Sequence, residues 1–204
     1  MALAHGFHDV EDGDIALVVT YLQMKSAPSR PAPPPPPGLV LDRVLRPDVG
    51  ANRALYRRIG EEWLWFSRLR QDDQALAALL GHPRYETYEL RRDGTAVGLL
   101  ELDLRDGANV EIAFFGLVPG LIGQGAGAFM IGRALDLAWR RGTRRVWLHT
   151  CTADHPRAVE FYVSWGFVPY RRQVEVTVDP RLDGTLKASA AGRLPMLVRP
   201  ADQP

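Results

Sequence analysis

The chain has 204 residues, of which 46% are hydrophobic, and this size and composition are typical of one globular domain with short appendages. The formal net charge of +1 argues against a protein that binds nucleic acid through bulk positive charge. The single cysteine excludes a disulfide within the chain and favours a reducing compartment.

Residues 1–25 predict an N-terminal extension that carries one strand. Residues 1–14 are acidic and lack a basic n-region, so they are not a signal peptide. The β-branched, apolar run at residues 15–22 predicts a strand and is too short to span a bilayer. We therefore expect a cytoplasmic protein that does not enter a membrane. The strand is expected at a sheet edge, or exchanged with a partner chain in a homodimer.

Residues 26–38 form a proline-rich linker, in which residues 33–37 are all proline. Such a segment adopts an extended polyproline II conformation and lacks the N–H donors to join a sheet. We interpret it as a stiff spacer. The alternative is a docking site for a proline-binding module.

Residues 39–178 predict the domain proper. A strand at 39–45 precedes a helical region that begins near Asp48 and extends to about Trp65, and Asp72 or Asp73 is expected to cap a second helix that ends at Leu80. Between them, the aromatic and arginine-rich residues 63–70 either form the wall of an acceptor pocket or belong to the core, with the arginines on a solvated face.

Two hairpins follow, with strands at residues 85–92, 96–104 and 110–119. The third strand is apolar except for Glu111 near its start, and it is expected to be buried on both faces. Glu101 lies on the neighbouring strand. A glycine-studded turn, residues 120–127, then leads into a helical pattern that reaches residue 141.

A strand, a glycine turn and a helix start form a site for a phosphate-bearing ligand, because free N–H groups and the helix dipole favour an anion there. A P-loop would need Lys-Ser/Thr after the last glycine, where Ala128 and Phe129 stand. A dinucleotide fingerprint is formally matched by Gly123, Gly125 and Ala128, but the acid expected about 20 residues later is missing.

The remaining elements are a strand at residues 144–151, a short helix at 155–167 and a strand at 168–178. The first of these strands is expected to run parallel to the strand at 110–119 across the helix. Residues 179–204 show no period and are expected to be irregular or frayed.

The cluster of His149, Cys151, Asp154 and His155 contains residue types that bind metals, but four ligands this close in sequence seldom surround one ion, so we expect no metal site. Cys151 is interpreted as a buried structural thiol, with a nucleophile beside His149 as the alternative.

Three blocks in order resemble the GNAT superfamily of acetyl-CoA-dependent N-acetyltransferases. Glu111 precedes the turn, residues 123–127 resemble the family's Q/R-x-x-G-x-G/A turn, and residues 155–167 resemble its N-x-x-A-x-x-x-Y-x-x-x-G-F block. Ile122 stands where the family has Gln or Arg, so one side-chain contact to phosphate is expected to be missing, and His155 replaces the usual Asn. The resemblance implies an α/β (α+β) fold: a mixed, mostly antiparallel central sheet flanked by helices, here with an extra N-terminal strand.

The resemblance also implies direct transfer of the acetyl group of acetyl-CoA to a primary amine of a small molecule, amino acid or peptide. Glu111 is the candidate general base, with Glu101 and His149 in reserve, and its alternative role is a strand acid paired with an arginine or an amide. Tyr162 is the candidate general acid, or else a packed aromatic residue. The residues expected to contact coenzyme A are Phe115, Gly116, Leu117, Val118, Ile122, Gly123, Gln124, Gly125, Ala126, Gly127, Ala128 and His155.

A non-catalytic acyl-CoA-binding sensor or interaction module on the same fold is the alternative function. Glu111 and Tyr162 together favour the enzyme, because a pure binder needs neither. The sequence does not identify the acceptor amine.

Overall fold

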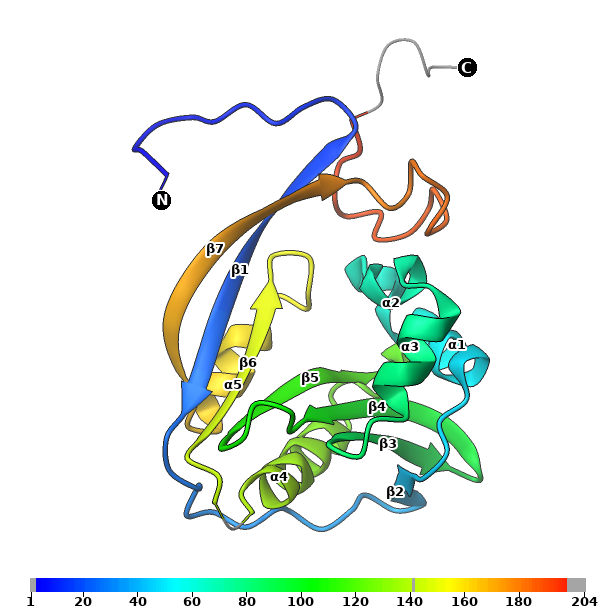
Figure 1. Cartoon of the computed structure of the whole chain (residues 1–204), viewed down its shortest axis with the longest axis vertical. Coiled ribbons are helices and arrows are strands. Elements are labelled where there is room, and N and C mark those ends of the chain that lie inside the picture. Colours follow the sequence, from blue (N-terminus) through cyan, green and yellow to red (C-terminus); the bar gives the residue numbers. More distant parts are fainter. Residues whose placement is uncertain (1–2, 141, 198–204) are drawn as a thin grey trace.

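The computed structural model describes residues 3–140 and 142–197, and within them it contains one mixed seven-stranded sheet in the order β2-β3-β4-β5-β6-β1-β7 (Figure 1). Neighbouring strands are antiparallel except for β5 and β6, which are parallel as predicted. The expected fold class, a mixed and mostly antiparallel sheet flanked by helices, is therefore confirmed. The strands are β1 (Asp14–Met24), β2 (Leu39–Val44), β3 (Tyr85–Arg92), β4 (Thr95–Asp103), β5 (Asn109–Leu117), β6 (Arg145–Cys151) and β7 (Val168–Val178).

Helices cover both faces of the sheet. Leu99 of β4 packs with residues of α1, whereas its neighbour Leu100 belongs to the cluster that contains residues of α4. Successive strand residues point to opposite faces, so α1 and α4 lie on opposite sides. The helices are α1 (Val49–Gly60), α2 (Ser67–Arg70), α3 (Asp73–Leu80), α4 (Ala126–Ala138) and α5 (Ala158–Ser164), with 3₁₀ turns at Glu61–Trp63 and Pro119–Leu121.

The helix starts follow the predicted caps. Asp48 accepts a hydrogen bond from the Ala51 N–H and Asp72 accepts one from the Ala75 N–H, each at 2.8 Å. The ends differ more from expectation. Helix α4 ends at Ala138, and Arg141 lies outside the described residues. Helix α5 is shorter than predicted because the segment from His155 to Arg157 forms a turn before it.

The N-terminal strand is not at a sheet edge, so that prediction is wrong. Strand β1 lies inside the sheet, where it pairs with β6 along one side and with β7 along the other. It is buried from both faces, with Leu17 and Val19 on one side and Leu22 and Met24 on the other. The proline-rich linker then runs past α4 to reach β2 at the far edge (Figure 1). The homodimer stays a prediction.

The sheet forks between β5 and β6. These strands pair only at Asn109↔Arg145, Val110↔Val146 and Glu111↔Trp147. Immediately beyond, the register of β5 against β4 shifts, so that Ala113 is an extra residue in β5. The two strands diverge from Glu111 onward, which leaves one side of β5 free to line a cavity and explains why most of this strand is half-buried and not buried on both faces.

The C-terminal segment is irregular but not frayed where the structure describes it. Residues 179–197 contain no helix or strand, yet Arg181 is buried, forms an ion pair with Asp179 and donates to the carbonyl groups of Ala190 and Leu194. Leu186 of this segment packs against a cluster that includes Leu17. The part at 198–204 lies outside the described residues. In the described part of the chain, no helix combines the length and apolarity needed to cross a membrane.

Candidate active site

A cavity of about 710 Å³ opens at the fork between β5 and β6. Its walls come from the turn before α4, from β5 and β6, from the segment between α1 and α2, and from α5. Glu111, His149 and Tyr162 all line it. The size is within the range of ligand-binding pockets. Residues predicted from separate sequence blocks thus meet in one space.

The turn before α4 presents backbone donors to this cavity. Gly125 caps the helix with φ of 80°, and no side chain caps it. The first helical hydrogen bond runs from Phe129 N–H to the Gly125 carbonyl, and no described residue accepts a bond from the N–H groups at positions 126–128. Gly123 has φ of 84°, a backbone conformation that favours glycine. This arrangement suits a phosphate or diphosphate group.

Nine of the twelve residues predicted to contact coenzyme A line the cavity, and three do not. Val118 packs in the core and donates its N–H to the Val97 carbonyl. Ala126 is fully buried, and the Gln124 side chain donates to the Gly120 carbonyl at 2.6 Å. The residues that line the cavity are Phe115, Gly116, Leu117, Ile122, Gly123, Gly125, Gly127, Ala128 and His155.

Glu111 stands where the fork begins and is paired with His149. The Nδ1 atom of His149 lies 3.6 Å from Oε1 of Glu111, and the Glu111 side chain keeps 21% of its surface exposed. The adjacent Glu111 carboxylate raises the pKa of His149 above its ordinary value. The pair can accept a proton from a group bound in the cavity.

Glu101, the first reserve candidate for the base, is fully buried and does not line the cavity. Its carboxylate accepts hydrogen bonds from Asn52 Nδ2 at 2.8 Å, from Arg68 Nη2 at 2.6 Å and from the Tyr85 hydroxyl at 2.5 Å. Arg68 is itself buried, so the expected solvated face does not apply to it. Glu101 holds β4, β3 and the α1–α2 region together.

Tyr162 projects from α5 into the cavity. Its ring packs edge-on against Phe115 and Phe167, each with centroids 6.0 Å apart. Among the described residues, no hydrogen-bond partner acts on the pKa of its hydroxyl. Burial, followed by the negative charge of Asp154, raises the pKa of Tyr162, so the phenol keeps its proton at neutral pH.

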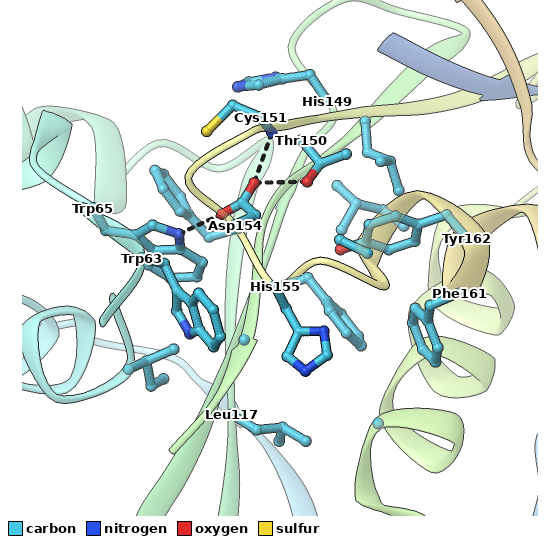
Figure 2. Close-up of a pocket in the computed structure, with 18 of the residues that line it drawn as sticks. Trp63, Trp65, Leu117, His149, Thr150, Cys151, Asp154, His155, Phe161 and Tyr162 are labelled. Carbon is cyan, nitrogen blue, oxygen red and sulfur yellow. Dashed lines mark hydrogen bonds between the residues drawn. The ribbon is translucent and has the colours of Figure 1, made fainter. Parts of the chain in front are cut away.

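Asp154 organises the end of β6, a role that the sequence did not reveal. Its carboxylate accepts bonds from Trp65 Nε1 at 3.0 Å, from the Thr150 hydroxyl at 2.6 Å and from the Cys151 N–H at 2.8 Å (Figure 2). Burial, together with the charge of Asp154, raises the pKa of the Cys151 thiol to about 12. A thiol that is protonated at neutral pH does not act as a nucleophile.

Aromatic side chains form the wall opposite α5. Figure 2 shows Trp63 and Trp65 on one side of the cavity and Phe161 and Tyr162 on the other. The rings of Tyr56 and Phe114 pack against Trp65, with centroids 5.2 and 5.5 Å away. The aromatic segment therefore contributes both to the core and to the pocket wall. Among the residues that the structure describes, no cluster of three His, Cys, Asp or Glu side chains could hold a metal ion.

Residues 52–167 match the model of the acetyltransferase (GNAT) family. The chain belongs to the GNAT family. Among curated proteins it is similar to an uncharacterized N-acetyltransferase of Mycobacterium tuberculosis, with 36% identity over 45% of this chain and 58% of the relative. It is also similar to the mycothiol acetyltransferase of Beutenbergia cavernae, with 36% identity over 38% of this chain and 26% of that protein. The chain thus matches little more than half the length of the mycobacterial relative.

Solved structures of GNAT proteins share the fold at low sequence identity. A GCN5-related N-acetyltransferase from Kribbella flavida aligns with a TM-score of 0.54 and 19% identity, over 84% of this chain and 63% of that one. An aminoglycoside acetyltransferase from an uncultured soil sample aligns with a TM-score of 0.52 and 19% identity, over 62% of this chain and 86% of that one. These likenesses support the GNAT fold.

Both departures from the GNAT motifs lie at the cavity. Ile122 is 42% exposed beside the glycine turn, where it offers an apolar surface and no hydrogen bond to a phosphate. His155 packs its ring 5.3 Å from that of Trp63. The backbone donors of the turn do not depend on either side chain.

Proposed function

We propose that this chain is an N-acetyltransferase that moves the acetyl group of acetyl-CoA directly to a primary amine. One observation carries the proposal: a single cavity joins a helix start with free N–H groups, a carboxylate–imidazole pair and a tyrosine hydroxyl. Family membership supports the use of acetyl-CoA.

The proposed coenzyme position follows from the backbone of the turn. The N–H groups of Gly127 and Ala128 would hold the diphosphate of acetyl-CoA, assisted by the positive end of the α4 dipole. The free side of β5, from Phe115 to Leu117, would then bind the pantetheine arm. This placement leads the thioester toward the fork of the sheet, where Glu111 stands.

In the proposed reaction, Glu111 removes a proton from the acceptor amine, directly or through water. The amine nitrogen then bonds to the thioester carbonyl carbon, the carbon–sulfur bond breaks, and the Tyr162 hydroxyl gives its proton to the departing thiolate. The second proton that the nitrogen loses returns to Tyr162 through water, and Glu111 releases the first proton to solvent. The raised pKa of Tyr162 keeps this proton in place until the sulfur carries negative charge. His149 lies beside Glu111, with Nδ1 3.6 Å from Oε1, and its imidazole would orient the carboxylate by charge.

The acceptor half of the cavity favours a cationic amine with an apolar or aromatic body. Three carboxylates line the cavity, those of Glu111, Asp154 and Glu175, against one arginine, Arg157. The tryptophans of the wall offer ring faces to an apolar body or to an ammonium group. We therefore propose small amines of this kind, ahead of peptides, as acceptors.

The test is an assay of free thiol released from acetyl-CoA in the presence of a panel of aliphatic, aromatic and amino-sugar amines. We expect turnover with a cationic acceptor, and we expect Tyr162→Phe to lower kcat by about tenfold or more while the affinity for CoA is kept. Binding of CoA without turnover across the panel would contradict the proposal and favour a non-catalytic acyl-CoA-binding module.

A further inference from the structure

A second cavity, of about 450 Å³, lies beside the first and is walled by the proline-rich linker. Its lining includes Arg30, Pro31 and Pro33 from the linker, and Ala128 and Phe161 from α4 and α5. Ala128 and Phe161 also line the main cavity, so the two spaces adjoin at these residues. No described residue accepts a hydrogen bond from the Ala128 N–H.

The linker lies against α4 between Ala32 and Pro36. A Cβ atom at Gly132 would lie 2.7 Å from Ala32 Cα, and one at Gly125 would lie 3.8 Å from Pro36 Cγ. The step from Gly125 to Gly132 covers about 10 Å along the helix, and the step from Ala32 to Pro36 covers about 12 Å of polyproline II. The two segments therefore have similar lengths and run antiparallel to each other. Gly132 has no side chain, and this permits the close approach.

Arg30 is a cation without an anionic partner at the mouth of this cavity. Its guanidinium stacks 3.4 Å from the ring centroid of Trp165, which is 6% exposed. No carboxylate in the described part of the chain forms an ion pair with Arg30. A guanidinium held on a buried aromatic ring, with its remaining donors free, is suited to a phosphate group.

We propose that the proline-rich linker is part of the coenzyme site and that Arg30 binds the 3′-phosphate of the adenosine end of coenzyme A. This inference rests on the proposed function, which places the diphosphate at the start of α4. From there, the nucleotide end of the coenzyme would leave the main cavity past Ala128 and enter the second one. The linker would thereby distinguish coenzyme A from a form that lacks the 3′-phosphate.

The experiment compares binding of CoA and of 3′-dephospho-CoA to the full chain by titration calorimetry. We expect the chain to prefer CoA by about tenfold, as one charge-assisted contact would give. Arg30→Ala should abolish this preference by weakening CoA binding and leaving dephospho-CoA binding unchanged. Arg30→Lys should retain part of it. Arg133→Ala, which removes the same charge from the outer side of α4, should keep the preference in full.

A second variant tests the linker itself. Gly132→Ala substitutes no residue that lines either cavity but forces Ala32 away from α4, so it should also reduce the preference for CoA. The inference is overturned if Arg30→Ala keeps the preference, if the wild-type chain binds both compounds equally, or if Arg157→Ala alone removes it. If the wild-type chain binds neither compound, the proposed function fails, and this inference fails with it.

Discussion

Two glutamates on adjacent strands of the sheet have opposite surroundings. Glu101 on β4 is fully buried and accepts hydrogen bonds from three side chains, whereas Glu111 on β5 pairs with His149 and faces the cavity. A carboxylate whose oxygens are all occupied by donors stabilises the fold but cannot take a proton from a ligand. A carboxylate oxygen that is free to accept a proton from the cavity therefore separates a candidate base from a structural acid. Residue type and position on a strand do not.

The largest expected effect is on the chemistry at Glu111. Glu111→Gln keeps the shape of the side chain and removes its ability to accept a proton, so kcat should fall by about 100- to 10,000-fold. The affinity for CoA and the free energy of unfolding should stay close to wild type. Steady-state kinetics with the best acceptor amine, alongside urea denaturation, measure both. A wild-type kcat in this variant would assign the base role elsewhere.

The reverse pattern is expected at Glu101. Glu101→Ala leaves the buried Arg68 without its counter-charge, and breaking a buried pair in this way costs about 3–5 kcal/mol of unfolding free energy. Urea unfolding followed by circular dichroism measures the loss, with Glu111→Ala as the matched control that should cost much less. Equal losses in the two variants would contradict the distinction between them.

A smaller effect is expected in the titration of His149. Its pKa is raised by Glu111, so it should lie above the usual value of about 6.5 and should fall in Glu111→Gln but not in Glu101→Gln. Because the folded-state pKa is the higher one, the stability that the pair contributes is present below about pH 6.5 and is lost as pH rises through the folded pKa. NMR titration, with the signal assigned by His149→Gln, tests this.

The smallest effect is expected at Cys151, which lines the same cavity. With a pKa of about 12, its thiol is protonated at pH 7.5 and should react slowly with iodoacetamide. Cys151→Ala should change kcat by less than about threefold, because the thiol takes no part in the proposed reaction. A loss of kcat as large as that in Glu111→Gln would favour the alternative interpretation of Cys151 as a nucleophile.

The sequence predicts local features of this chain well. Asp48 and Asp72 start the helices as capping residues because the signal lies within four residues of each cap. The same holds for the glycine turn, whose φ angles only glycine adopts easily. The order and spacing of the family motifs were sufficient to predict that Glu111 and Tyr162 line one cavity.

Contacts between distant segments could not be predicted in this way. Arg68 and Glu101 are 33 residues apart, and no periodicity links a helix arginine to a strand acid. The sequence pattern indicated Asp154 only as one of four residues of types that bind metals. Its hydrogen bond from Trp65 could not be predicted, because the two residues are 89 positions apart. The ordered packing of residues 179–197 depends on Arg181 and on single apolar residues, which leave no repeating pattern.

The position of β1 also governs when the sheet can close. Strand β1 pairs with two strands that lie far later in the chain, so residues 14–24 must wait for about 120 more residues before β6 can pair with one edge and for about 150 before β7 completes the other. Until then, an apolar strand with two open edges is exposed to wrong partners. Closure of this long loop is an entropically costly, non-local event, which makes β1 insertion the expected slow step of folding.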